Sequence, residues 1–126
     1  MIAATWNIRG LSDRLKQSKI RKLVKDHSLG LLCIIETRVQ NVSKDFIQQS
    51  LIRGWKFISN YQCSTLGRIW FGWDPNHFDV QLVSEYDKFI HTFVTDVQRS
   101  QSFFATFIYG HNNRGKKDNV AGNYSI

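Results

Sequence analysis

The chain has 126 residues, of which 42% are hydrophobic and 13% aromatic, and it carries a formal net charge of +7. This length and composition predict one folded domain with its own core and exclude disorder over most of the chain. The sequence contains no run of 18 apolar residues and no signal peptide at its start, so we expect neither a membrane span nor secretion. Two cysteines, Cys33 and Cys63, are too few for a disulfide or metal framework, which favours an intracellular location, in the nucleus or the cytoplasm.

The excess of basic residues is confined to the first half of the chain. Residues 1–60 contain 11 lysines and arginines against 4 acidic residues, whereas residues 61–126 contain six of each. A basic surface attracts polyanions such as nucleic acid. A solvated charged face without a partner explains the same numbers equally well, and the charge alone does not choose between the two interpretations.

Two apolar segments near the start of the chain predict neighbouring strands. Residues 2–8 form the first, which is apolar on both faces as in a central strand, and Gly10 permits the turn after it. Residues 31–35 form the second. One helix-sized segment separates them, so the pattern predicts a βαβ unit with parallel strands. Asn7 and Glu36 stand at the carboxyl ends of these strands, where ligands collect in parallel sheets.

The segment between the two strands predicts an amphipathic, basic helix. Ser12 or Asp13 can cap its start, because a short side-chain oxygen satisfies the free N–H groups of the first turn. The helix runs to about His27, and Gly30 is the expected stop. Apolar residues at helical spacing predict a buried stripe made of Ile20, Leu23, Val24 and His27.

The rest of the chain predicts one more helix and a series of strands. The helix covers residues 44–51, with Ser43 as its cap. The strands are expected to form an antiparallel meander, with residues 74–76 as a turn within it. Their segments are residues 55–59, 68–73, 78–83, 89–97 and 103–109. A polar and basic tail, residues 111–126, is expected to be disordered.

Four segments in series resemble the endonuclease/exonuclease/phosphatase superfamily. They are Trp6-Asn7-Ile8-Arg9-Gly10-Leu11, Glu36-Thr37-Arg38-Val39, Gly67-Arg68-Ile69-Trp70-Phe71-Gly72-Trp73-Asp74-Pro75, and Phe107-Ile108-Tyr109 with Asn112 behind it. Each segment alone is weakly specific, but their order and spacing match across nearly the whole chain. Within the superfamily, the sequence is most similar to the endonuclease domain of plant LINE-type (non-LTR) retrotransposons.

This resemblance implies a two-sheet α/β sandwich of the DNase-like type and Mg²⁺-dependent hydrolysis of phosphodiester bonds in DNA. It assigns the metal to Glu36, placement of the scissile phosphate to Asn7, and support of the phosphate and the transition state to Tyr109. It also assigns substrate binding to Arg9 and Asn112. The residue types agree with this chemistry, because Mg²⁺ takes oxygen ligands from one or two carboxylates, water and phosphate.

Two motifs that complete the site in the superfamily do not stand at the expected places in this sequence. An Asp-x-Asn motif after a later strand supplies the base in the superfamily, and a Ser-Asp-His motif near the C-terminus supplies a histidine for the phosphate. Here residues 74–76, Asp-Pro-Asn, precede Tyr109, and Lys25-Asp26-His27 ends the first helix. The chain therefore resembles the N-terminal half of the domain, a truncated sandwich over residues 1–110.

The candidate residues also have structural interpretations. Glu36 could be a surface residue after a strand, Asn7 a turn former, and Tyr109 an aromatic residue at the end of a buried strand. Tryptophans can stack on bases, but packing is the favoured role for Trp55, Trp70 and Trp73, as it is for His91.

Three functions are consistent with the sequence. The first is a Mg²⁺-dependent endonuclease domain of retroelement origin that is inactive as this chain, because a site without its base and histidine loses most of its rate. The second is a nucleic-acid-binding module without catalysis, and the third is a non-functional retroelement remnant. DNA is the expected partner in the first two, and no membrane is expected as a partner in any of them.

Overall fold

The computed structural model of the chain describes residues 3–61, 68–109 and 123–125. Within these ranges, no helix is long and apolar enough to cross a membrane. The elements, in chain order, are β1 (Ala3–Asn7), α1 (Arg14–His27), β2 (Leu31–Ile35), α2 (Asn41–Leu51), β3 (Lys56–Ser59), β4 (Ile69–Trp73), β5 (Phe78–Tyr86), β6 (Phe89–Asp96), β7 (Gln101–Ile108) and β8 (Asn123–Ser125).

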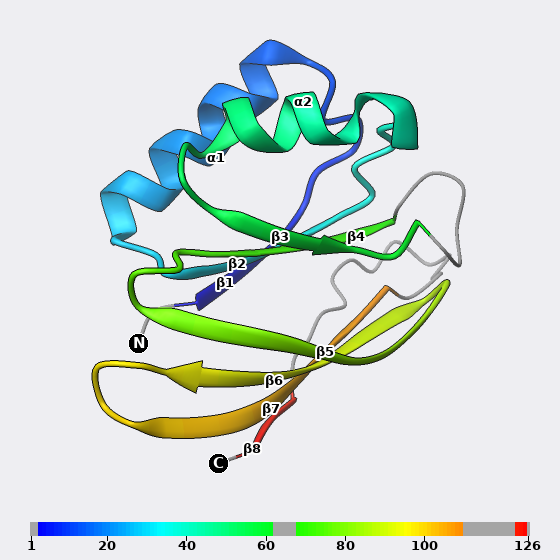
Figure 1. The fold of residues 1–126 in the computed structure, drawn as a ribbon. Coiled ribbons are helices and arrows are strands. Elements are labelled where there is room, and N and C mark those ends of the chain that lie inside the picture. The colour runs from blue at the N-terminus through cyan, green and yellow to red at the C-terminus, as the bar shows by residue number, and fades with distance from the viewer. Residues whose placement is uncertain (1–2, 62–67, 110–122, 126) are drawn as a thin grey trace.

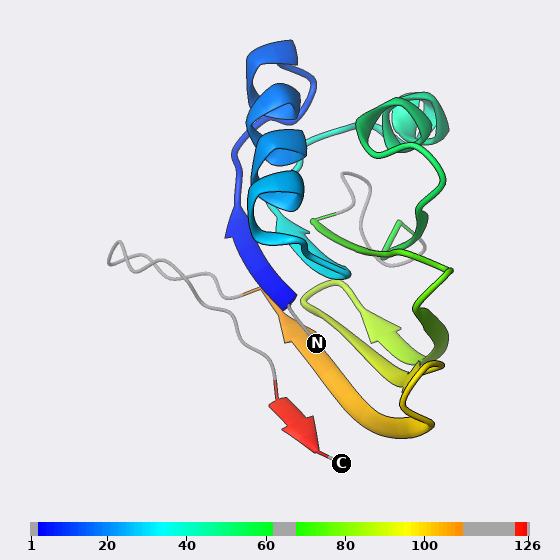
Figure 2. The ribbon, with the colours of Figure 1, turned by 90° about the vertical axis from the view of Figure 1, so that its left-hand side faces the viewer.

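These elements form three layers (Figure 1 and Figure 2). The first sheet has the strand order β1-β2-β4-β3, and the second has the order β5-β6-β7-β8. Both helices cover the face of the first sheet that points away from the second sheet. One cluster of apolar side chains fills the space between the helices and the first sheet, and another fills the space between the two sheets. This architecture is the predicted two-sheet α/β sandwich.

β2 lies inside the first sheet, and all five of its residues are buried. Alternate side chains point to opposite faces of a strand, so three of them pack toward the second sheet and two toward the helices. β1 pairs with β2 in parallel, from Ala3 opposite Leu31 to Asn7 opposite Ile35, as the βαβ pattern predicts. The expectation that β1 is a central strand is wrong. Among the described strands it pairs only with β2 at the edge of the sheet, and none of its residues is fully buried.

The side chain of Asp13 begins α1, and a left-handed backbone conformation ends it. The carboxylate of Asp13 accepts a hydrogen bond of 2.9 Å from the N–H of Leu15, which resolves the choice between the two predicted caps. The helix ends at Ser28, whose φ of 51° is left-handed, and not at Gly30. Gly30 has a packing role instead, because a Cβ there would lie 2.5 Å from the ring of Phe78.

Two further expectations for the helices are wrong. His27 is exposed, because it is the last residue of α1 and lies beyond the part of the helix that packs on the sheet. α2 begins at Asn41 and not at residue 44, and its N-cap residue Gln40 makes no side-chain hydrogen bond. Ser43, the predicted cap, lies in the first turn of α2, where its N–H donates to the carbonyl of Gln40.

The five predicted strand segments all form strands, but they do not form one meander. β3 and β4 make an antiparallel hairpin that joins the first sheet, where β4 pairs antiparallel with β2. β5, β6 and β7 form the meander of the second sheet, and β8 pairs with β7. β4 belongs to the first sheet because its five residues are all buried, and only that sheet is covered on both faces. Apart from β8, the predicted tail of residues 111–126, Asn112 included, lies outside the described residues.

The buried side chain of Asn60 connects the first sheet to the turn between β5 and β6. Its Nδ2 donates to the carbonyl oxygens of Tyr86 and Asp87, at 3.2 and 3.0 Å. Its Oδ1 accepts a hydrogen bond of 3.0 Å from the buried N–H of Ile69, at the start of β4. The side-chain amide of Asn60 therefore provides the acceptor for the buried N–H at the start of β4, and it holds the β3–β4 hairpin against the second sheet.

Replacing Asn60 with alanine should lower the free energy of unfolding by about 1–3 kcal/mol, because the N–H of Ile69 would remain buried without its acceptor. Urea unfolding followed by tryptophan fluorescence measures the loss. Asn76→Ala is the matched control, since Asn76 is exposed in the turn before β5, and it should change stability by less than about 0.5 kcal/mol. Equal losses in the two variants would contradict a connecting role for Asn60.

Candidate metal and phosphate site

The ends of β1 and β2 meet at one edge of the first sheet. We call this edge the Glu36 rim and define it by Asn7, Arg9, Glu36 and Arg38. Three backbone hydrogen bonds of 2.8–3.2 Å join residues 8–11 to residues 35–37 beyond the strand ends. The two loops therefore continue side by side after the sheet, which fixes the backbone of both predicted site residues.

The backbone of the loop after β2 is strained at the rim. Glu36 and Arg38 have φ values of 61° and 55°, which are left-handed and uncommon for residues other than glycine. Thr37 between them is fully buried, and the N–H of Glu36 donates to the carbonyl of Arg68 at 2.8 Å. Such strain costs on the order of 1–3 kcal/mol per residue, persists only where the surroundings impose it, and clusters at functional sites. The strain therefore supports the assignment of this loop to a site.

Tyr61 anchors this loop on the core. Its hydroxyl donates a hydrogen bond of 2.6 Å to the carbonyl of Val39 and accepts one of 3.2 Å from the indole N–H of Trp70. A tyrosine hydroxyl is protonated at neutral pH, and burial raises the pKa of Tyr61 further, so this hydroxyl is a donor over a wide pH range. The loop that contains the left-handed residues is thus fixed by Tyr61 to the apolar cluster beneath the helices.

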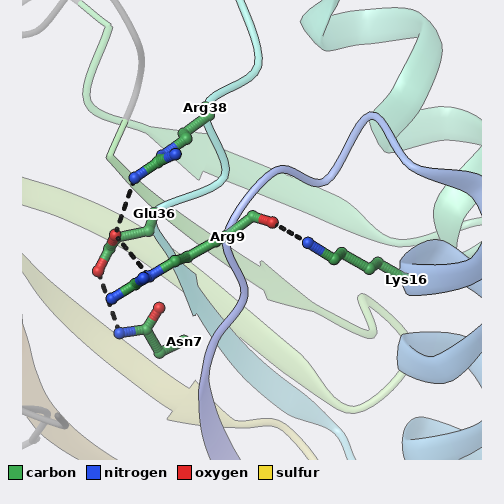
Figure 3. A network of polar contacts seen from close by, with 5 residues as sticks. All are labelled: Asn7, Arg9, Lys16, Glu36 and Arg38. Carbon is green, nitrogen blue, oxygen red and sulfur yellow. Dashed lines mark hydrogen bonds and ion pairs between the residues drawn. The ribbon is translucent and has the colours of Figure 1, made fainter.

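Glu36 is the centre of the polar network shown in Figure 3. Its Oε2 accepts a hydrogen bond of 3.1 Å from Nδ2 of Asn7, and its Oε1 lies 3.6 Å from Nε of Arg9 and 3.8 Å from a terminal nitrogen of Arg38. The Glu36 side chain is only 16% exposed, whereas those of the two arginines are 69% and 60% exposed. Lys16 donates to the carbonyl of Arg9 and adds a further cation. The rim therefore presents a shielded carboxylate surrounded by exposed positive charge.

Tyr109 reaches the same edge of the sandwich from the second sheet. Its ring centroid lies 5.3 Å from the guanidinium carbon of Arg68, a cation–π distance. The carbonyl of the same arginine holds the N–H of Glu36, so Arg68 joins Tyr109 to the rim. The backbone N–H of Tyr109 donates to the carbonyl of Lys88 at 2.7 Å, which fixes the end of β7.

The structure thus brings together three of the five residues predicted for the site, Asn7, Arg9 and Glu36, and it links a fourth, Tyr109, to them through Arg68. The fifth, Asn112, lies outside the described residues. Arg38 and Arg68 were missed as site residues, although both stand in segments used for the resemblance. The position of Arg38 two residues after Glu36 could have drawn attention to it, but no sequence pattern predicts a left-handed φ for an arginine.

The remaining candidates lie elsewhere and pack as predicted. His91, on β6, has a ring nitrogen 2.6 Å from the hydroxyl of Thr106 and stacks on Phe104. Trp70 and Trp73 are buried. Trp55 is partly buried and packs against the apolar cluster beneath the helices.

The oxygen atoms of the rim fit a hard divalent cation. In the described part of the chain, Oδ1 of Asn7 is buried without a hydrogen-bond partner, next to the carboxylate of Glu36. The same part of the chain holds no cluster of three or more histidine, cysteine or acidic side chains. Mg²⁺ needs no such cluster, since it keeps several waters and often binds one or two carboxylates together with phosphate. The contacts of the two arginines with Oε1 exceed hydrogen-bond length, so a metal ion can replace them at this oxygen.

The fold is similar to that of a solved structure, an AP endonuclease from Leishmania major. The TM-score is 0.64, the two sequences are 19% identical, and the match covers 87% of this chain. The chain spans only 40% of the length of that protein. No protein-family model and no curated protein matches the sequence. The structural likeness confirms the predicted fold class, a DNase-like α/β sandwich, of which this chain contains a part.

Replacing Arg38 with glycine should raise the free energy of unfolding by about 1 kcal/mol, because glycine adopts a left-handed φ without strain. Its exposed ion pair with Glu36 contributes little to stability. Arg53→Gly is the matched control: Arg53 is also exposed but has no left-handed φ, so this variant should lose roughly 0.5–1 kcal/mol. Urea unfolding of both variants gives the signs, and shifts in the same direction would contradict strain at Arg38.

Proposed function

We propose that the Glu36 rim binds Mg²⁺ and a DNA phosphate, as part of a nuclease-type site of the endonuclease/exonuclease/phosphatase superfamily. The observation that supports this most directly is the convergence of a shielded carboxylate, an unpartnered amide oxygen and exposed guanidinium groups on one edge of the sandwich. The fold similarity to an AP endonuclease is consistent with it. An origin from a plant LINE-type retroelement is part of the proposal and depends on the four sequence segments alone.

The protein ligands of the metal in this proposal are the carboxylate of Glu36 and Oδ1 of Asn7. A bound Mg²⁺ would polarise a phosphoryl oxygen and stabilise the oxygen that leaves. The hydrogen bond from Nδ2 of Asn7 to Oε2 of Glu36 orients the carboxylate, so that Oε1 lies next to the exposed guanidinium groups of Arg9 and Arg38. Asn7 therefore acts as a ligand and as a positioning residue for Glu36.

Arg9 and Arg38 are the proposed phosphate-binding residues. Guanidinium groups form forked hydrogen bonds with phosphate oxygens that are stronger than those between neutral groups. Both side chains are exposed at their ends and reach Glu36 from opposite loops, so a phosphate at the rim can accept from either (Figure 3). Tyr109, whose ring contacts Arg68, is the third residue proposed to support the phosphate.

We further propose that this chain alone does not cleave DNA at a measurable rate. The two sequence candidates for the missing base and histidine, Asp74 and His27, are both far from the rim. The N–H of Asp74 donates to the carbonyl of Gly30, at the start of β2, and His27 ends the helix just before that strand. The five residues of β2, at about 3.3 Å each, separate that edge from the rim by roughly 16 Å, too far for proton transfer at the phosphate.

The second candidate function is nucleic-acid binding without catalysis. It is favoured by the surface of α1, which carries six lysines and arginines against one acidic residue, Asp26. Cations in contact with phosphate release counterions, so this function and the proposed nuclease-type site both require DNA binding that weakens with salt. Metal binding distinguishes them, because only the nuclease-type site requires Mg²⁺ at Glu36.

Glu36→Gln should weaken Mg²⁺ binding by at least about tenfold, because a neutral amide is a poorer ligand for a hard cation than a carboxylate. Isothermal titration calorimetry with MgCl₂ measures the change. Asp79→Asn is the matched control, since it removes an exposed carboxylate on β5 and should leave the affinity unchanged.

Equal Mg²⁺ affinity in the wild type and in Glu36→Gln would refute the metal site. Nicking of supercoiled plasmid that survives this substitution would show that any cleavage comes from another place in the molecule.

Arg9→Ala and Arg38→Ala should each weaken binding of a fluorescein-labelled DNA duplex and should each lower the slope of log affinity against log salt by about 0.9, the contribution of one phosphate contact. Fluorescence anisotropy at several NaCl concentrations measures both quantities. Arg53→Ala, an exposed arginine after α2, should leave the slope unchanged. A salt-independent affinity of the wild type would exclude phosphate contacts altogether.

A further inference from the structure

Residues of α1 and α2 line a groove of about 730 Å³ between the two helices. One wall is the side of α1 that carries Arg14 and Arg21, and the other is the side of α2 that carries Val42 and Phe46. Gln17 and Ile47 also line it and are buried. No residue of the Glu36 rim lines this groove, so it is a separate surface.

The α2 wall exposes apolar side chains that the core does not use. Val42 is 88% exposed and Phe46 is 77% exposed. They lie four residues apart, so they are neighbours on one face of the helix. The buried face of α2 consists of other residues, Ile47, Gln48 and Leu51. Single exposed apolar residues are common, but adjacent ones in a groove mark an interaction surface.

The α1 wall is basic and is joined to the end of α2. The guanidinium of Arg21 donates to the carbonyl oxygens of Ser50 and Leu51, at 3.1 and 3.4 Å, which fixes the distance between the helices at this end of the groove. Asp26, the acidic residue of α1, forms an ion pair with Lys22 at 2.9 Å. The helix therefore retains a large positive excess, and Arg14 presents part of it to the groove.

We propose that this groove binds an acidic amphipathic helix of a partner protein. Apolar side chains of that helix, one turn apart, contact Val42 and Phe46, and its carboxylates face Arg14 and Arg21, the two cations of the groove lining. The lining of α2 from Val42 to Ser50 extends over about 12 Å, at 1.5 Å per residue, which matches two turns of a bound helix. The inference does not depend on the function of the Glu36 rim.

Charge complementarity and the apolar wall favour a protein helix over nucleic acid. The α2 wall offers no net positive charge, because Lys44 is paired with Asp45 at 3.1 Å. Of the two exposed apolar side chains of this wall, only Phe46 has an aromatic face on which a base could stack. A basic wall opposite an apolar wall is complementary to the two faces of an acidic amphipathic helix, in which charge adds specificity and the apolar contacts add affinity.

The test uses the 126-residue chain and a fluorescein-labelled helical peptide of 14 residues, with leucines four positions apart and glutamates along one flank. Fluorescence anisotropy should show saturable binding, and Phe46→Ser and Arg14→Glu should each weaken it by at least about fivefold. Leu15→Ser and Lys19→Glu are matched controls on α1 outside the groove lining, and each should change affinity less than about twofold. All four positions are exposed, and circular dichroism verifies that each variant is folded.

Three outcomes would overturn the proposal. The first is the absence of saturable binding of the peptide to the wild-type chain. The second is equal binding of a peptide in which serines replace the leucines. The third is displacement of the peptide by a single-stranded oligonucleotide whose own affinity falls in Arg14→Glu but not in Phe46→Ser, which would assign the groove to nucleic acid.

Discussion

The burial of β2 on both of its faces is the constraint on which the rest of the structure depends. A strand with five consecutive buried residues needs an apolar layer on each side. The helix that must connect it in parallel to β1 supplies part of one layer, and the second sheet supplies the other. Because β2 is fixed in this way, the position of its carboxyl end is also fixed, and Glu36 follows directly after that end.

The Glu36 rim combines strain with stabilising contacts from the core. Glu36 and Arg38 occupy left-handed backbone positions that cost free energy, and the buried Thr37 between them holds the loop in place. The hydroxyl of Tyr61 secures the same loop through the carbonyl of Val39. The result is a carboxylate that stays shielded while the cations around it remain exposed. A loop selected for stability alone would place glycine at the left-handed positions.

The parts of the fold that depend on neighbouring residues were predictable from the sequence. The five residues of β2, a helix cap at Ser12 or Asp13 and the position of Asn7 at a strand end follow from patterns within a few residues. The division of the β-strands between two sheets was not predictable, because it depends on which strand β4 pairs with. Its partner is β2, and 33 residues separate Ile35 of β2 from Ile69 of β4, which is beyond any local pattern. The contribution of Arg38 to the site was not predictable for a related reason. Its side chain lies near Glu36 because of a left-handed backbone conformation that tertiary contacts impose.

The cations of α1 lie on two different surfaces, so the net charge of the chain has to be interpreted separately for each surface. Lys16 contacts the loop that carries Arg9, on the side of the rim, whereas Arg14 and Arg21 line the groove beside α2. At the rim the cations surround a carboxylate and oxygen donors, a combination suited to a metal and a phosphate. In the groove they oppose apolar side chains, a combination suited to an amphipathic helix. A basic composition is therefore compatible with a nucleic acid and with an acidic protein, and the groups opposite each cation determine which of them it binds.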